Sequence, residues 1–227
     1  LCLASGYTAP RELTDLTMLP FLYEDMEPFT NRIIYYETSR GCPYRCSYCL
    51  SSIDKKVRLR DIDVVKRELQ FFLDQNVKQV KFIDRTFNCD HKHAMEIWEY
   101  IYKHDNGVTN FHFEISADIL REEEIALLNR FRPGLAQLEI GVQSTNPETI
   151  RAIHRVMNVD RLEKNWRKLI TPQDTIVLAG DISWAMRLTD TRKDFAFLQQ
   201  LPGQKIIMKG NHDYWWTTKA KMERFIA

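Results

Sequence analysis

The hydrophobic and polar positions of this chain follow two periods in its first two thirds. Short β-branched and aromatic runs predict strands over residues 32–38, 79–84, 110–116 and 137–143. Apolar side chains that recur every three or four positions predict helices over residues 61–74, 91–104 and 122–131, and a further helix from Pro147 onward. Asp90 and Asn146 are expected to cap the second and fourth helices. Four successive β–α units predict an α/β fold with a parallel sheet.

The last third of the chain has a different pattern. Helices are expected over residues 160–170 and 190–200, and short strands over residues 175–179 and 205–209. We therefore expect three segments: an extended lead-in over residues 1–30, a core over 31–160 and a short α/β segment over 161–227. As a hypothesis, the two late strands extend the first sheet beside strand 137–143, which would cover its exposed edge.

Composition and charge exclude several classes of protein. The chain has 227 residues, 44% of them hydrophobic, and its net charge is +1. This composition excludes global disorder, and it indicates neither a nucleic-acid partner nor a basic membrane patch. No apolar run reaches the roughly 18 residues of a transmembrane helix. The start, LCLASGYTAP, has no initiator Met and no secretory signal, so we expect a fragment of a longer protein.

Three of the five cysteines, Cys42, Cys46 and Cys49, lie within RGCPYRCSYCLSS, directly after the first predicted strand. Three thiolates on one loop can each bind one iron of a [4Fe–4S] cluster and leave the fourth iron open. A structural zinc site normally has four protein ligands, so zinc would need a distant His. Zinc and unliganded thiols both remain alternatives. The odd cysteine count, without a secretory signal, argues against a disulfide framework. A reducing cytoplasm is expected, because free thiolates and an oxygen-sensitive cluster both need it.

Cys42, Cys46, Tyr48 and Cys49 match C-x-x-x-C-x-aromatic-C, and over about residues 31–160 the chain resembles the radical S-adenosylmethionine (SAM) superfamily. The resemblance implies a partial (β/α) TIM-like barrel in which the three cysteines bind a [4Fe–4S] cluster. It also implies that the open iron binds SAM. An electron donor then allows SAM to yield a 5′-deoxyadenosyl radical, which takes hydrogen from a substrate. Neither the substrate nor the oligomeric state follows from this resemblance.

Further stretches, KFIDRTFNCDHKHAMEIWEYI, FHFEISADIL and LEIGVQSTNPETI, resemble radical SAM proteins with an upstream cobalamin-binding domain. That resemblance implies cobalamin in a domain outside this chain. It also implies that Tyr48 contacts the cofactor, that Asp84 contacts the SAM amino group, and that Glu114, Gln143 and Ser144 lie near its ribose and carboxylate. For Asp84 and Gln143, a polar strand-end residue that caps the next helix remains the alternative. Such residues converge because parallel strands end at one edge of the sheet.

In the last third, TPQDTIVLAGDISWAM and LPGQKIIMKGNHDYWW resemble fragments of the calcineurin-like metallophosphoesterases. The resemblance implies that Asp181 and Asn211 bind a divalent metal (Mn, Fe or Zn) and that His212 is a catalytic acid. Other ligand motifs of that family are missing from this segment. The alternative functions are therefore a metal-dependent phosphoesterase fragment, or a non-catalytic chimera of two families joined near residues 158–165.

Overall fold

The computed structural model of the chain describes residues 2–3, 6–7 and 12–226. The chain divides into two compact units, residues 1–157 and 158–227, close to the boundary expected between residues 160 and 161. At the start, β1 (Cys2–Leu3) pairs antiparallel with β2 (Gly6–Tyr7). The other residues of the predicted lead-in up to residue 11 lie outside the described residues.

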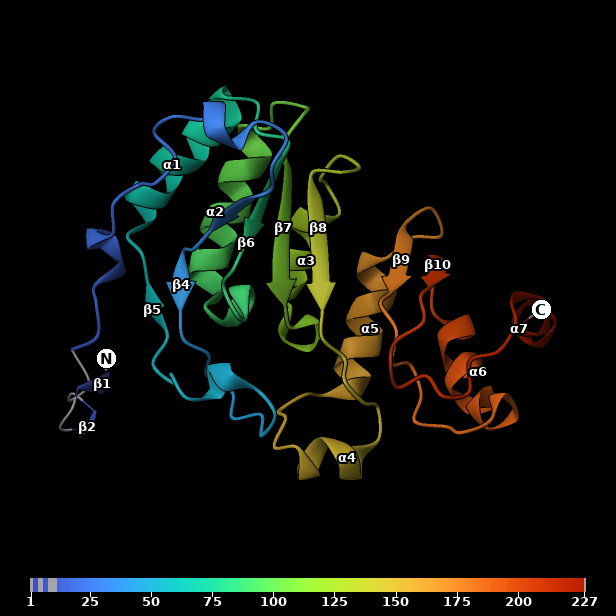
Figure 1. Ribbon diagram of the computed structural model, residues 1–227. Helices are drawn as coiled ribbons and strands as arrows, with labels where there is room; N and C mark the ends of the chain where they lie inside the picture. Colours follow the sequence, from blue (N-terminus) through green and yellow to red (C-terminus); the bar gives the residue numbers. More distant parts are fainter. Residues whose placement is uncertain (1, 4–5, 8–11, 227) are drawn as a thin grey trace. The chain divides into compact units, whose positions relative to one another are not determined.

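A four-stranded parallel sheet organises the first unit. Its strands follow one another in chain order, namely β3 (Ile34–Tyr36), β6 (Gln79–Phe82), β7 (Asn110–Ile115) and β8 (Ala136–Ile140). The arrowheads of β7 and β8 point to the same edge in Figure 1. The four predicted strands are confirmed. Each strand lies beside its predecessor, as at the start of a (β/α) barrel.

A helix follows each predicted strand region. These helices are α1 (Ile62–Asp74), α2 (His91–Lys103), α3 (Glu122–Leu128) and α4 (Pro147–Ala152). The predicted caps are confirmed, because the side chains of Asp90 and Asn146 accept backbone N–H groups in the first turn of α2 and α4. Helix α3 ends at Leu128, three residues earlier than predicted, and a turn follows it. Helix α4 is short, and His154, just beyond it, has a left-handed φ of 52°.

The core of the first unit lies on one face of the sheet. Val80, Phe82, Phe111 and Phe113 occupy alternate positions of β6 and β7 and are fully buried. The Trp98 ring of α2 packs edge-on against Phe113. Successive strand residues point to opposite faces, so the intervening residues form the second face, which is polar and half-buried. In a closed barrel that second face would line the interior.

The described part of the lead-in packs on α1 and is not simply extended. It contains two short 3₁₀ turns, Leu16–Met18 and Glu27–Phe29. The rings of Phe21 and Tyr23 lie 5.5 and 5.7 Å from that of Phe72. Further contacts come from Arg60, which donates to the Leu19 carbonyl and forms a buried ion pair with Glu68 of α1. No hydrophobic period marks these contacts in the sequence.

The second unit contains its own small sheet. Its elements are α5 (Val159–Leu169), β9 (Thr175–Leu178), α6 (Arg192–Gln200), β10 (Gln204–Ile207) and α7 (Lys219–Ile226). The hypothesis that the late strands extend the first sheet is wrong, because β9 and β10 pair with each other in a separate two-stranded sheet. Helix α7 was not predicted. None of the helices in the described ranges is long and apolar enough to cross a membrane.

Candidate cofactor site

The cysteine loop begins where the chain leaves the sheet. The strand β4 (Ser39–Arg40) pairs antiparallel with β5 (Arg58–Leu59) and closes the base of the loop. At Gly41 the backbone has a φ of +98°, and a Cβ there would lie 2.5 Å from the Lys56 carbonyl oxygen, so the position requires glycine. The next residue, Cys42, donates its N–H to the Asp54 carbonyl at 2.9 Å. The first cysteine is therefore held at the loop base.

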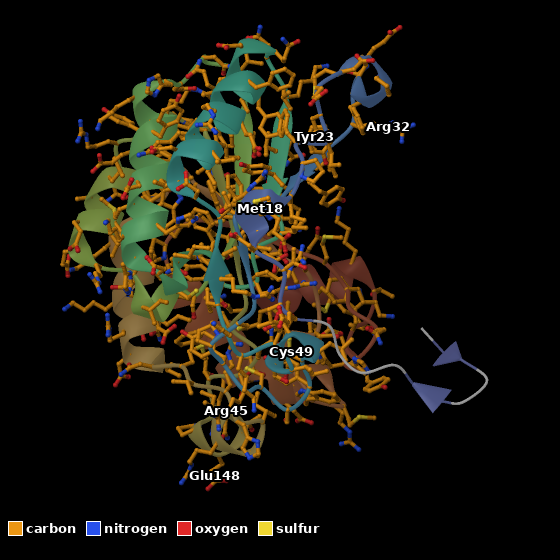
Figure 2. All side chains as sticks on the ribbon, turned by 90° about the vertical axis from the view of Figure 1, so that its left-hand side faces the viewer. Met18, Tyr23, Arg32, Arg45, Cys49 and Glu148 are labelled. Atoms are coloured by element: carbon orange, nitrogen blue, oxygen red, sulfur yellow. The ribbon has the colours of Figure 1, made fainter. Side chains whose placement is uncertain are left out.

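The three thiols lie at the edge where the parallel strands end. Cys42 and Cys46 are buried and Cys49 is half-buried. The Cys42 sulfur lies 3.6 Å from the Thr86 hydroxyl, which follows β6, and the Cys49 N–H donates to the Cys46 carbonyl. Figure 2 shows Cys49 at the same end of the first unit as Glu148 of α4, and far from Tyr23. The loop thus occupies the edge at which parallel β/α proteins place their chemistry.

The donor set fits an iron–sulfur cluster better than a single ion. Among the described residues, no three His, Cys, Asp or Glu side chains are grouped so that they can hold one metal ion. A mononuclear zinc site requires four ligands around one point. A [4Fe–4S] cube presents a different iron to each thiolate, so its ligands need not converge. The thiols of Cys42, Cys46 and Cys49 are free and share one short loop.

Asp84 joins the ends of β3 and β6. Its carboxylate is 1% exposed, and it accepts the Thr38 hydroxyl at 2.7 Å and the Thr38 N–H at 3.1 Å. Burial raises the pKa of Asp84 to about 6, although hydrogen bonds from Thr38 and Ser39 oppose the shift. Asp90, and not Asp84, caps α2. Asp84 therefore fixes the backbone that leads into the cysteine loop.

Glu114 belongs to a charged cluster on the second face of the sheet. The Lys81 ammonium lies 3.9 Å from the Glu114 carboxylate and 2.9 Å from that of Glu139, which is also 3.1 Å from the His112 ring. Burial, together with the charge of Glu139, raises the pKa of Glu114. Sequence reasoning missed Lys81, His112 and Glu139. Their signal was a polar residue at every second position of three successive strands.

The other predicted cofactor residues flank the loop between β8 and α4. Gln143 is exposed and has a left-handed φ of 66°, while the Ser144 hydroxyl accepts the Asn146 N–H at 3.1 Å. Asn146, and not Gln143, caps α4. The hydroxyl of Tyr48 accepts a hydrogen bond from Arg155 at 3.1 Å. Arg155 also donates to the Gly141 carbonyl just after β8 and was not identified from the sequence.

In the second unit, the predicted metallophosphoesterase residues come together on two loops. The Asp181 carboxylate lies 3.1 Å from the His212 Nδ1 and also accepts the His212 N–H, and these hydrogen bonds lower the pKa of Asp181. Asn211 is 3.4 Å from the other His212 ring nitrogen. Asp213, which sequence reasoning missed, is buried and accepts N–H groups from both loops, including those of Asp181 and Gly210.

A parallel β/α half-barrel with three free thiols in the loop after its first strand defines the class of the first unit. Residues 36–171 match the radical SAM superfamily, and the chain belongs to that superfamily. This confirms the family that the cysteine motif and the surrounding residues resemble.

Three curated relatives show partial similarity. The chain is 36% identical over 63 residues to an uncharacterized methyltransferase of Pyrococcus horikoshii, covering 26% of this chain and 14% of that protein. It is 23% identical over 153 residues to the hopanoid C-2 methylase of Rhodopseudomonas palustris, and this match covers 64% of this chain and 29% of that protein. It is 25% identical over 136 residues to the anaerobic magnesium-protoporphyrin IX monomethyl ester cyclase of Rubrivivax gelatinosus, and this match covers 59% of this chain and 24% of that protein. The chain thus spans less than a third of each relative.

Solved structures share the fold. One is the radical SAM methyltransferase TsrM of Kitasatospora setae, with cobalamin and a [4Fe–4S] cluster bound (TM-score 0.56, 16% identity, 78% of this chain and 36% of that chain). Another is the cobalamin-dependent SAM radical enzyme OxsB (TM-score 0.54, 16% identity, 85% of this chain and 30% of that chain). At these identities the likeness concerns the fold alone.

Proposed function

We propose that this chain is the cofactor-binding part of a radical SAM enzyme, with Cys42, Cys46 and Cys49 as the ligands of a [4Fe–4S] cluster. The observation that carries the proposal is the placement of these three free thiols on one loop, at the edge where the parallel strands end. When bound, the cluster and SAM supply an electron and a radical that takes hydrogen from a substrate. The protein supplies binding, orientation and shielding from water.

Five further residues are proposed to face SAM. Tyr48 lies within the loop, and Asp84 holds the base of the loop through Thr38. Gln143 and Ser144 follow β8 on the same edge, and Glu114 belongs to β7. Support for these assignments is their common location around the loop and along the polar face of the sheet.

The remaining cofactors and partners are also part of the proposal. The cobalamin-dependent enzymes with the same fold support cobalamin bound by a domain outside this chain. An electron donor is the expected partner, because the cluster needs one electron from outside. A reducing cytoplasm suits both free thiolates and an oxygen-sensitive cluster.

Iron and acid-labile sulfide after anaerobic reconstitution test the cluster site. We expect about four irons per chain in the wild type, and almost none in a Cys42→Ala, Cys46→Ala, Cys49→Ala variant. Cys89→Ala is the matched control, because Cys89 is a half-buried free thiol outside the loop. Wild-type protein without iron, or a triple variant that retains it, would contradict the proposal.

A second candidate function concerns the second unit, where the adjacent Asp181 carboxylate and His212 imidazole favour divalent-metal phosphoesterase chemistry. Manganese-dependent hydrolysis of bis(p-nitrophenyl) phosphate is the assay. This candidate requires that Asp181→Ala abolishes hydrolysis and that the triple cysteine variant retains it. If the wild type shows no hydrolysis, the second unit is a non-catalytic segment.

A further inference from the structure

The segment that contains the cysteine loop is much more positively charged than the rest of the chain. Residues 41–60 contain five Lys or Arg and one Asp, which is a net charge of +4, although the whole chain has a net charge of only +1. Two of these arginines form ion pairs, Arg58 with Asp54 and Arg60 with Glu68 of α1. Three cations of the segment therefore remain to be accounted for.

The three remaining cations are Arg45, Lys55 and Lys56. Their side chains are exposed, and none of them forms a hydrogen bond or an ion pair in the described part of the chain. Their charges are thus not compensated by the protein itself, and they create a positive field at this surface that attracts an anionic partner.

The same segment exposes two large apolar side chains. Leu50 is 84% exposed and Ile53 is 79% exposed, and they begin and end the 3₁₀ turn that directly follows Cys49. The Ile53 N–H donates to the Leu50 carbonyl at 3.2 Å, so the turn holds both side chains in place. An apolar centre within a charged rim is typical of the surface at which one protein binds another.

Backbone contacts keep these side chains close to the thiols. The Cys42 N–H donates at 2.9 Å to the carbonyl of Asp54, the residue that precedes the two lysines. Figure 2 shows Arg45 and Cys49 at the same end of the first unit, and Arg32 at the opposite end. The uncompensated cations, the apolar turn and the three thiols therefore belong to one surface.

We propose that this surface is the docking site of an acidic protein that carries one electron on a flavin or an iron–sulfur cluster. We call it the donor surface, and it consists of Arg45, Leu50, Ile53, Lys55 and Lys56. The inference rests on the proposed function, because a donor is needed only if the cysteine loop holds a cluster. The carrier loses one electron and the cluster gains it, and no bond or proton moves.

An acidic carrier suits the donor surface for two reasons. Electron transfer slows steeply with distance, so the electron must enter through the surface nearest the cluster, and the loop that supplies all three thiolates forms that surface. Complementary charge brings the carrier to this surface and orients it, while the apolar turn provides a contact that excludes water.

The experiment measures the binding of two acidic probes, a flavodoxin and a [2Fe–2S] ferredoxin, to the reconstituted full chain by anaerobic calorimetry. The double variant Lys55→Glu, Lys56→Glu reverses two charges outside the cysteine triplet. Ile53→Ser removes apolar area and leaves the charges. The matched control is Arg32→Glu, Lys78→Glu, which reverses two exposed charges shortly before β3 and β6, at the opposite edge of the sheet.

We expect Lys55→Glu, Lys56→Glu to weaken the binding of at least one probe about tenfold, and the control to bind it like the wild type. Ile53→Ser should weaken the binding about fivefold, because less apolar area is removed from water. Wild-type binding should also weaken between about 0.1 M and about 1 M salt, because the Debye length falls from about 10 Å to about 3 Å.

The rate of electron transfer provides a second readout. Reduced flavodoxin or ferredoxin should reduce the cluster about tenfold more slowly in Lys55→Glu, Lys56→Glu than in the wild type. The methyl viologen radical is a cation, so its reaction should not become slower in that variant. A probe that binds but passes no electron to the cluster would overturn the inference.

Other outcomes also decide the question. If iron-loaded wild type binds neither probe, or if the donor-surface and control variants bind equally, the inference is wrong and the proposed function stands. Single-stranded RNA is the counter-probe, and RNA that binds more tightly than both proteins and is lost in Lys55→Glu, Lys56→Glu would assign the surface to nucleic acid instead. Wild-type protein that binds no iron contradicts the proposed function itself, and the inference falls with it.

Discussion

The two units of the chain support their strands in different ways. In the first unit, alternate residues of β6 and β7 are fully buried beneath helices. In the second, β9 and β10 have no buried residue at all, and one buried cluster consists of Phe195, Trp215 and Met222 from helices and a loop. A two-stranded sheet is marginal by itself, so the second unit depends on a few aromatic contacts.

Each unit also buries one carboxylate that organises its candidate site. Asp84 and Asp213 are each 1% exposed. Asp84 accepts the hydroxyl and the N–H of Thr38 at the end of β3, whereas Asp213 accepts three backbone N–H groups. The first arrangement fixes the end of a strand in a large sheet. The second holds two exposed loops together, so we expect the second site to be the less rigid.

The largest predicted effect is in the core of the first unit. The Phe113 ring lies 4.5 Å from Phe82 and 4.6 Å from Phe87, so Phe113→Ala should lower the free energy of unfolding by about 3–5 kcal/mol. Trp215→Ala is the matched change in the second unit. Hydrogen exchange should show lost protection in β6 and β7 for the first variant, and in β9 and β10 for the second. If either variant loses protection equally in both units, the units are not independent.

A smaller effect concerns the dependence of stability on pH. The pKa of Asp84 is raised to about 6 in the folded chain, against roughly 3.9 when unfolded. Between these two pKa values the folded chain holds a proton on Asp84 that the unfolded chain has lost. The stability that this proton contributes is fully present below pH 4 and is lost as the pH rises through 6. The loss amounts to about 3 kcal/mol at roughly 1.4 kcal/mol per pKa unit.

Asp84→Asn should remove this part of the pH dependence, as measured by urea unfolding between pH 4 and pH 7.5. Thr38→Val offers a sharper test, because it removes the hydroxyl that stabilises the ionised carboxylate. That variant should move the transition to higher pH. An unchanged pH profile in both variants would contradict the role given to burial.

Asp213→Asn should have a smaller effect that is confined to the second unit. The amide replaces one of the two acceptor oxygens, so at least one N–H from Asp181, Ile182 or Gly210 loses its partner. Hydrogen bonds to a charged group contribute about 1.5–3 kcal/mol each. Exchange at residues 180–183 and 210–213 should accelerate, while iron uptake by the cysteine loop stays at the wild-type level. Reduced iron uptake would contradict this confinement.

The sequence predicted those features that depend on the period of hydrophobic residues or on the spacing of residues close together in the chain. Strands β6 and β7 were predictable because their buried residues alternate, and the cysteine loop because its three thiols are close in sequence. The β4–β5 pair was missed, since two residues per strand carry no period. The contact between Arg155 and Tyr48 was missed because an arginine after a helix has no local signal, and its partner is set by the fold alone.

The smallest predicted effect concerns the Asp181–His212 pair. Both side chains are more than 40% exposed, so water screens their interaction and His212→Ala should leave the free energy of unfolding almost unchanged. The Asp181 carboxylate would still accept the N–H of residue 212, because that bond comes from the backbone. Urea unfolding checks the stability, and nuclear magnetic resonance titration should show the Asp181 pKa moving up toward its ordinary value. A large loss of stability would mean that the imidazole, and not Asp213, holds the two loops together.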